Sequence, residues 1–218
     1  MRGDRVSWIV RCAVLGAVVC SLPGCNWVGA IAYFVMGKER EVHYEAQYRG
    51  LEQKTGAVLV AAPPEIYSRY PNAVSNICAA VTSRLAERIP GGRFVEPTEV
   101  IKFQNANPYW TSEGYGSLIR RLKVDRLVYI DISGYQLSEE GNPHVLQGEV
   151  SAGVGVIERE QPQFDRFGFY TTLVSRFPEK SALGVVNSDA QTIELGTLAT
   201  FSQDVQNIFL DHTKIEKR

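Results

Sequence analysis

The sequence has almost no net charge and few cysteine and histidine residues. Its 218 residues carry 23 Lys and Arg against 24 Asp and Glu, a formal net charge of −1. It therefore lacks the basic field that binds nucleic acid through its phosphates. The cysteines and histidines are Cys12, Cys20, Cys25, Cys78, His43, His144 and His212. They form no Cys-x-x-Cys pair and no histidine cluster, so we expect no zinc site and no disulfide framework.

Signatures of catalysis are also missing. The chain has no Gly-x-Ser-x-Gly elbow, and its glycines complete neither a dinucleotide fingerprint nor a P-loop. We expect no cofactor and no enzymatic activity. Asp125 and Asp131 flank a predicted strand, and a hydrolase that uses them as an acid–base pair is one hypothesis. That hypothesis fails if replacing both carboxylates leaves every activity intact.

The N-terminus has the pattern of an export signal. Arg2, Arg5 and Arg11 precede a stretch without charged residues from Cys12 to Gly37. A positive segment followed by an apolar one is typical of a secretory signal peptide. The uncharged stretch is also longer than the roughly 20 residues that span a bilayer. An uncleaved single-pass anchor and, third, a buried core helix are therefore alternatives.

The end of the apolar stretch resembles the lipobox of bacterial lipoproteins, on the residues Leu22, Pro23, Gly24 and Cys25. The resemblance implies cleavage between Gly24 and Cys25 and a diacylglycerol on the Cys25 thiol. Pro23 departs from the family, where a small residue other than proline is commoner. Proline and glycine near the middle of the stretch also weaken the alternative of a membrane-spanning helix.

These observations divide the chain into a signal peptide (1–24), a lipidated N-terminus and tether (25–55), an α/β domain (56–213) and a tail (214–218). The lipid on Cys25 would hold the protein at the membrane. In the lipoprotein family an aspartate after the cysteine retains the protein in the inner membrane, and Asn26 stands there instead. We therefore expect the periplasmic face of the outer membrane rather than the inner membrane. The apolar residues 27–36 either lie in the membrane interface or pack against the domain or a partner.

Hydrophobic periodicity predicts an α/β fold for the domain. Apolar or alternating runs predict strands at 57–63, 93–96, 125–132, 146–156 and 167–177. Three- and four-residue spacing predicts helices over about 72–89, 98–104 and 118–122, and a C-terminal helix from about Ser188. Ser188 and Gln191 match a capping box. The order β-α-β-α-β-β-β-α indicates a mixed sheet of three to five strands packed by helices, in a single domain.

The domain resembles a group of outer-membrane lipoprotein domains. The residues that carry the resemblance are Cys25, the strand GAVLVAAP (56–63), the helix through Arg88 and the segment RRLKVDRLVYIDISGYQLSE (120–139). They are similar to the curli-secretion lipoproteins, the lipoprotein activators of peptidoglycan synthases and the N-terminal domain of the Tol–Pal translocation protein. In that group a turn leads into the central strand. Here the turn positions are occupied by Leu122, Val124 and Asp125. The resemblance implies binding and assembly without catalysis.

Two non-catalytic roles follow from this resemblance. One is an envelope lipoprotein that binds or assembles with envelope proteins. The other is a homo-oligomeric outer-membrane export component, although the long insertions that build the curli-secretion pore are not evident here. The candidate contact surface is the aromatic loop 107–116, with Tyr109, Trp110 and Tyr115. The alternative for this loop is that Trp110 folds back to cover the edge of the sheet.

Overall fold

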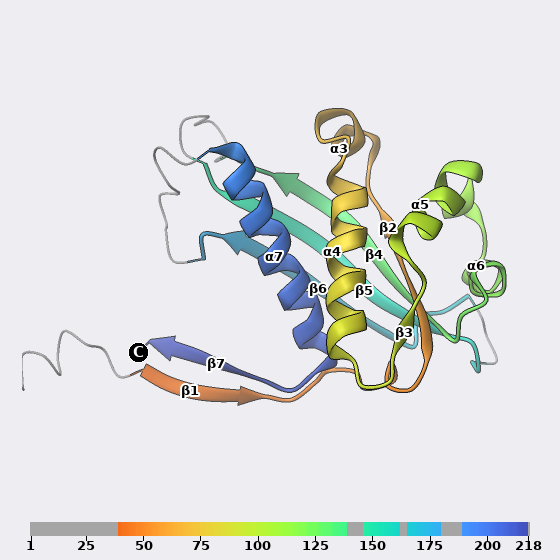
Figure 1. Ribbon diagram of the computed structural model, residues 1–218, viewed down its shortest axis with the longest axis horizontal. Helices are drawn as coiled ribbons and strands as arrows, with labels where there is room; N and C mark the ends of the chain where they lie inside the picture. Colours follow the sequence, from red (N-terminus) through yellow and green to blue (C-terminus); the bar gives the residue numbers. More distant parts are fainter. Residues whose placement is uncertain (1–38, 139–145, 162–164, 180–188, 218) are drawn as a thin grey trace, which may run out of the picture. The chain divides into compact units, whose positions relative to one another are not determined.

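The computed structural model describes residues 39–138, 146–161, 165–179 and 189–217 (Figure 1). The expected cleavage site at Gly24 and Cys25, the apolar segment 27–36 and the expected cap at Ser188 lie outside these residues. The chain divides into two compact units. One comprises residues 1–43 with 213–218, and the other runs from Tyr44 to His212.

The unit from Tyr44 to His212 has the predicted mixed α/β architecture. Its sheet has the order β3-β2-β4-β5-β6, in which β2 is parallel to β3 and β4, and the later strands are antiparallel. The strands are β2 (Thr55–Ala61), β3 (Arg93–Phe94), β4 (Arg126–Gln136), β5 (Gly148–Glu158) and β6 (Phe169–Phe177). The helices are α3 (Pro64–Arg69), α4 (Ala73–Arg88), α5 (Pro97–Ala106), α6 (Tyr115–Leu122) and α7 (Ala190–Phe209), with a 3-10 turn η1 (Trp110–Ser112).

The structure departs from the sequence prediction at three places. Helix α3 was missed; Pro64 occupies its first turn, where a missing N–H costs nothing, and Glu65 favours the same turn electrostatically. The C-terminal helix is capped by Asp189, whose side chain accepts a hydrogen bond from the amide of Thr192, so the predicted capping box is wrong. In the other unit, β1 (Glu39–Tyr44) and β7 (His212–Lys217) pair as an antiparallel ribbon, where we expected a connector and a tail.

Part of the predicted tether belongs to the packed unit. Leu51 is buried in the core, and the Tyr48 hydroxyl donates to the Glu158 carboxylate at 2.5 Å. The amide of Gln47 donates to the carbonyl of Ile208 at 2.8 Å. The guanidinium of Arg126, which is buried, donates to the carbonyl of Gly50 at 2.9 Å. These contacts fix the segment, which reads as polar in the sequence, against the ends of α7 and the sheet.

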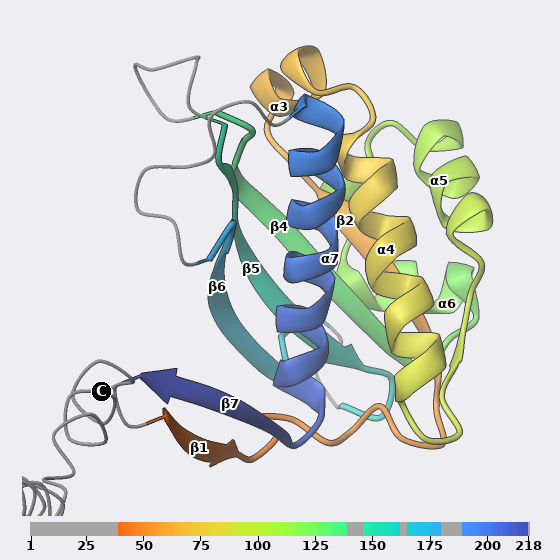
Figure 2. The same cartoon turned by 60° about the vertical axis from the view of Figure 1, so that its left-hand side comes forward.

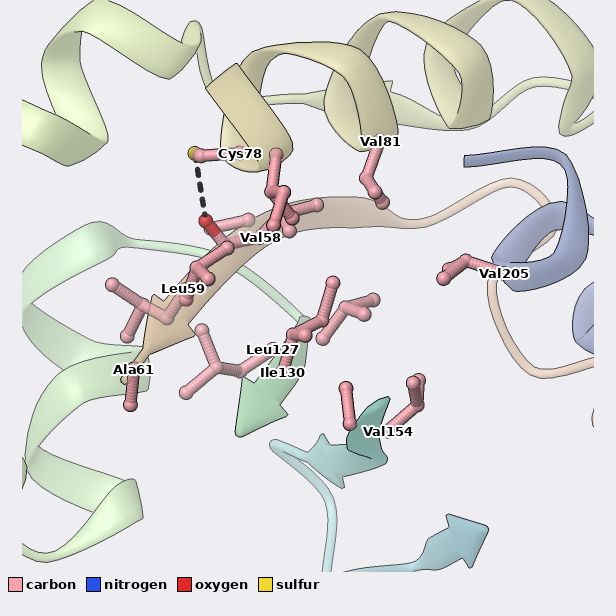
Figure 3. Close-up of a cluster of buried hydrophobic side chains, with 14 of the residues drawn as sticks. Val58, Leu59, Ala61, Cys78, Val81, Leu127, Ile130, Val154 and Val205 are labelled. Atoms are coloured by element: carbon pink, nitrogen blue, oxygen red, sulfur yellow. Dashed lines mark hydrogen bonds between the residues drawn. The ribbon is translucent and has the colours of Figure 1, made fainter. Parts of the chain in front are cut away.

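Helices α4 and α7 lie side by side over one face of the sheet (Figures 1 and 2). That face carries Val58 and Ile130, which Figure 3 draws in one cluster with Val81 of α4 and Val205 of α7. All four side chains are completely buried. The stretches from Ala57 to Val60 and from Leu127 to Val128 are buried at every residue, which is characteristic of parallel strands covered on both faces.

Aromatic side chains cover the opposite face of the sheet. Tyr129 of β4 is in register with Leu59 of β2 and with Gly155 of β5. The ring of Phe167 lies over Gly155 so closely that a Cβ atom there would come within 2.4 Å of it. Tyr129 and Phe167 have ring centroids 6.1 Å apart. Gly155 thus leaves room for the Phe167 ring, which a larger residue at position 155 would displace.

A hydrogen-bonded pair of residues aligns the starts of β2 and β4. The Asp125 carboxylate accepts from the Thr55 hydroxyl at 2.7 Å and from the Thr55 amide at 3.1 Å. The amide of Asp125 donates in turn to the Thr55 carbonyl at 2.9 Å. Donation by the Thr55 hydroxyl and amide lowers the pKa of Asp125 below its ordinary value.

We expect Asp125→Asn to lower the free energy of unfolding at pH 7 by about 1 kcal/mol, a figure discounted for the partial exposure of the carboxylate. A carboxyl with a lowered pKa in the folded state stabilises that state above its unfolded pKa, near 3.9, and the stabilisation disappears as the pH falls through the folded value. Urea unfolding of both proteins from pH 7 to pH 3 should therefore show the difference shrinking below about pH 4. Asp131→Asn, at an exposed position of the same strand, is the control. A difference that is constant across this range would contradict the assignment.

Cys78 of α4 is buried. Its Sγ donates to the carbonyl of Val58 at 3.4 Å (Figure 3). Burial raises the pKa of the Cys78 thiol to about 11.

Alkylation requires the thiolate, so we expect iodoacetamide at pH 8 to leave Cys78 unmodified in the folded protein and to modify it after unfolding, as measured by peptide mass spectrometry. Ser83→Cys places an exposed thiol on the same helix and should react without denaturant. Equal reaction at both sites would show that Cys78 is accessible.

Candidate functional site

The aromatic loop 107–116 does not form one exposed surface. Trp110 is only 5% exposed, and its ring centroid lies 6.0 Å from that of Tyr129. Tyr115 is partly buried and makes an edge contact with Tyr129 at 5.4 Å. Tyr109, at 82% exposed, faces solvent. Trp110 therefore covers the sheet, which is the alternative left open by the sequence, and contact of a partner with Tyr109 stays a prediction.

Arg121 of α6 holds this loop against α5. Its guanidinium forms an ion pair with Glu113 and donates to the side-chain oxygen of Asn107. It also lies 4.7 Å from the centroid of the Phe103 ring. The amide of Asn107 donates back to the carbonyl of Phe103 at 2.6 Å. The loop is thus tied at both ends, and Trp110 is held in place between α5 and the sheet.

A cavity of about 460 Å³ opens beside Trp110, between α3, the start of α4, α5 and the turn η1. Its volume falls in the range of about 300–1,000 Å³ that is usual for ligand sites. The lining residues are Tyr67, Pro71, Val74, Ser75, Ile101, Gln104, Asn105, Pro108 and Trp110. None of the nine carries a charge. The predicted aromatic loop thus contributes one wall of the cavity.

The polar groups of the cavity are neutral donors and acceptors. Gln104 is buried, and its Nε2 donates to the carbonyl of Val60 at 2.9 Å, which fixes the orientation of the amide. The Ser75 hydroxyl donates to the carbonyl of Asn72 at 2.9 Å and keeps its lone pairs. Burial raises the pKa of Tyr67, so its hydroxyl remains a donor. Asn105 is exposed, and its side-chain amide makes no hydrogen bond within the described part of the chain.

The structure does not bring Asp125 and Asp131 together. Six positions along an extended strand separate them, a distance of about 20 Å. Asp125 is occupied by Thr55, and Asp131 is exposed. This geometry does not provide the close pair of carboxylates that acid–base hydrolysis needs.

Neither a metal cluster nor a membrane-spanning helix occurs in the part of the chain that the structure describes. Among those residues, no three His, Cys, Asp or Glu side chains converge in a way that could hold an ion. His212 instead stacks on Tyr44, with ring centroids 5.3 Å apart, and His144 lies outside the described residues. Over the same residues, every helix is too short or too polar to cross a bilayer.

Sequence reasoning missed the cavity because its residues come from four separate segments. Tyr67 belongs to α3, which the sequence pattern does not predict. Gln104 and Asn105 lie near the end of α5, and their polar side chains gave no sign of a cavity. A signal was present in the prolines: Pro71 follows α3 and Pro108 follows α5, and a proline shortly after a helix marks its end.

No family model and no curated protein matches the chain. Among solved structures it is similar to the PelC dodecamer from Paraburkholderia phytofirmans, with 9% identity over 74% of this chain and 93% of that chain, and a TM-score of 0.44. It is also similar to lipoprotein GNA1162 from Neisseria meningitidis, with 15% identity over 70% of this chain and 96% of that chain, and a TM-score of 0.42. A third similar structure is the hypothetical protein CT253 from Chlamydia trachomatis, with 13% identity over 74% of this chain and 96% of that chain, and a TM-score of 0.44. Such TM-scores and identities are too low to carry an inference about what this chain does.

We expect Trp110→Ala to lower the free energy of unfolding by about 3–5 kcal/mol, because it empties a large buried volume beside Tyr129. Tyr109→Ala, one residue away and exposed, should change it by no more than about 0.5 kcal/mol. Urea unfolding followed by circular dichroism measures both values. A loss below about 1 kcal/mol for Trp110→Ala would show that the indole does not hold the loop to the sheet.

Proposed function

We propose that the protein is a membrane-anchored envelope lipoprotein that binds or assembles with other envelope proteins and has no catalytic role. The observation that carries this proposal is the segment Leu22-Pro23-Gly24-Cys25 after an arginine-rich start and an apolar stretch. Lipid on Cys25 would supply the anchor, which is stable when two or more acyl chains are attached and marginal with one. Asn26 favours the periplasmic face of the outer membrane.

The described domain supports a binding role in two ways. Its candidate acid–base residues are far apart, and Asp125 is already engaged by Thr55. Its cavity is instead lined by neutral side chains with an apolar wall, a composition common in binding sites. These features fit recognition of a ligand better than chemistry upon one.

Self-association into an export component is the second candidate, and one observation favours it. Strand β6 ends the sheet order and has no strand on its outer side among the described residues. Its exposed face carries Tyr170 and Val174, each 54% exposed. An unpaired edge beside exposed apolar side chains is a template for strand pairing with another chain.

Native mass spectrometry of the full chain, extracted from its host membrane in mild detergent, tests the anchor. We expect a mature mass that begins at Cys25 and includes acyl chains. Cys25→Ser should remain unprocessed and unacylated, since no thiol is present to accept the lipid. Cys20→Ser is the matched control and should mature normally.

A wild-type mass that retains Met1 would contradict the anchor proposal and favour the uncleaved single-pass helix. The same spectrum reports the number of copies. A closed ring of many copies would move the role to the export component, whereas a monomer or small complex would favour partner binding.

A further inference from the structure

We propose that the cavity between α3, α4 and α5 is the partner-binding site, and that it takes an uncharged, extended peptide segment with one branched apolar side chain inserted. The protein nature of the ligand rests on the proposed function. The chemical class of the segment rests on the cavity itself. Four features of the described residues carry the inference.

The first feature is the absence of charge. None of the nine residues that line the cavity is ionisable at neutral pH, since the Tyr67 hydroxyl stays protonated. A carboxylate or an ammonium group that entered would lose its hydration without gaining an opposite charge. The ligand is therefore neutral where it contacts the cavity.

The second feature is the apolar wall. Val74 and Trp110 are buried, and Ile101 is half-buried beside them. With the rings of Pro71 and Pro108, they provide hydrocarbon contacts for a side chain such as leucine. Because α4 and α5 both pack on β2, the wall is part of the folded core and is preformed. Preformed sites bind at a lower cost in conformational entropy.

The third feature is the presence of both donors and acceptors among the polar residues that line the cavity. The amide nitrogen of Gln104 is committed to Val60, which leaves its Oε1 as an acceptor for an N–H group. Ser75 Oγ is a second acceptor, because its proton goes to Asn72. The Tyr67 hydroxyl and the Asn105 amide nitrogen are donors for carbonyl groups. A peptide backbone presents one N–H and one C=O per residue and matches this set.

The fourth feature separates a peptide from a glycan. A sugar packs through its C–H faces on exposed aromatic rings, whereas Trp110 is only 5% exposed, and the hydroxyl groups at the rim of a sugar ring would lie against Val74, Ile101 and the two prolines without a partner. Buried hydroxyls without hydrogen bonds are costly. A peptide places its polar groups along the backbone and its hydrocarbon on the side chain, which matches a lining that contains both hydrogen-bonding and apolar side chains.

The test uses the full chain as purified from its host membrane, whether or not it has been cleaved, in lipid nanodiscs, labelled with 5-fluorotryptophan and observed by ¹⁹F NMR. The probes are N-acetyl-Ala-Leu-Ala-amide, its versions with Asp or Lys in place of Leu, and the disaccharide diacetylchitobiose. We expect the leucine tripeptide to shift the Trp110 resonance saturably and to leave that of Trp27 unchanged. The charged versions should bind at least about tenfold more weakly.

Two substitutions on α5 locate the binding. Asn105→Phe fills the opening of the cavity and should weaken binding of the leucine tripeptide by about tenfold or more. Lys102→Phe adds the same ring at another exposed position of α5 that does not line the cavity, and should leave the affinity unchanged. Equal weakening by both variants, no shift of Trp110, or equal binding of the charged tripeptides would each overturn the proposal. A shift with the disaccharide alone would make the cavity a glycan site. None of these results depends on acylation of Cys25, which the mass spectrum decides separately.

Discussion

The parallel pairing of β2 with β4 is the constraint on which the rest of the domain depends. A parallel pair in the middle of a sheet has to be covered on both faces, because its residues are apolar on both. Here α4 and α7 cover one face (Figure 2), and the segment from α5 to α6 covers the other with Trp110 and Tyr115. The Asp125–Thr55 pair fixes where the two strands begin. The register of the two strands then determines which side chains face α4 and α7 and which face Trp110 and Tyr115.

The same constraint explains the position of the cavity. Helices α4 and α5 both contact β2, while α3 ends before Pro71 and α5 ends before Pro108, so neither of these two helices extends further along the cavity. Trp110 then folds in beside this space to reach Tyr129. The residue that completes the cover of the sheet is thus also the wall of the cavity, so packing and recognition use the same indole.

The elements of the sheet could be predicted from the sequence because their signals are local. Apolar runs such as AVLVAAP and the helical spacing through Leu85 are properties of short windows. The ribbon of β1 and β7 could not, since its two strands lie near opposite ends of the sequence and neither is apolar. The aromatic loop was ambiguous for a related reason: aromatic residues suit both a contact surface and a core. Only the register of Tyr129 decides that Trp110 is covered while Tyr109 is not. The cavity was beyond prediction, because it exists only once four segments have packed.

The chain enters and leaves the α/β unit at one corner, where Tyr44 stacks on His212. A force between the segment before residue 44 and the segment after residue 212 therefore does not have to pass through the sheet. A pull between these two segments would act first on the pairing of β1 with β7 and on the Tyr44–His212 contact, before it reached β2, β4 or β5. The folded core of the α/β unit is therefore mechanically protected from a pull between its two flanking segments.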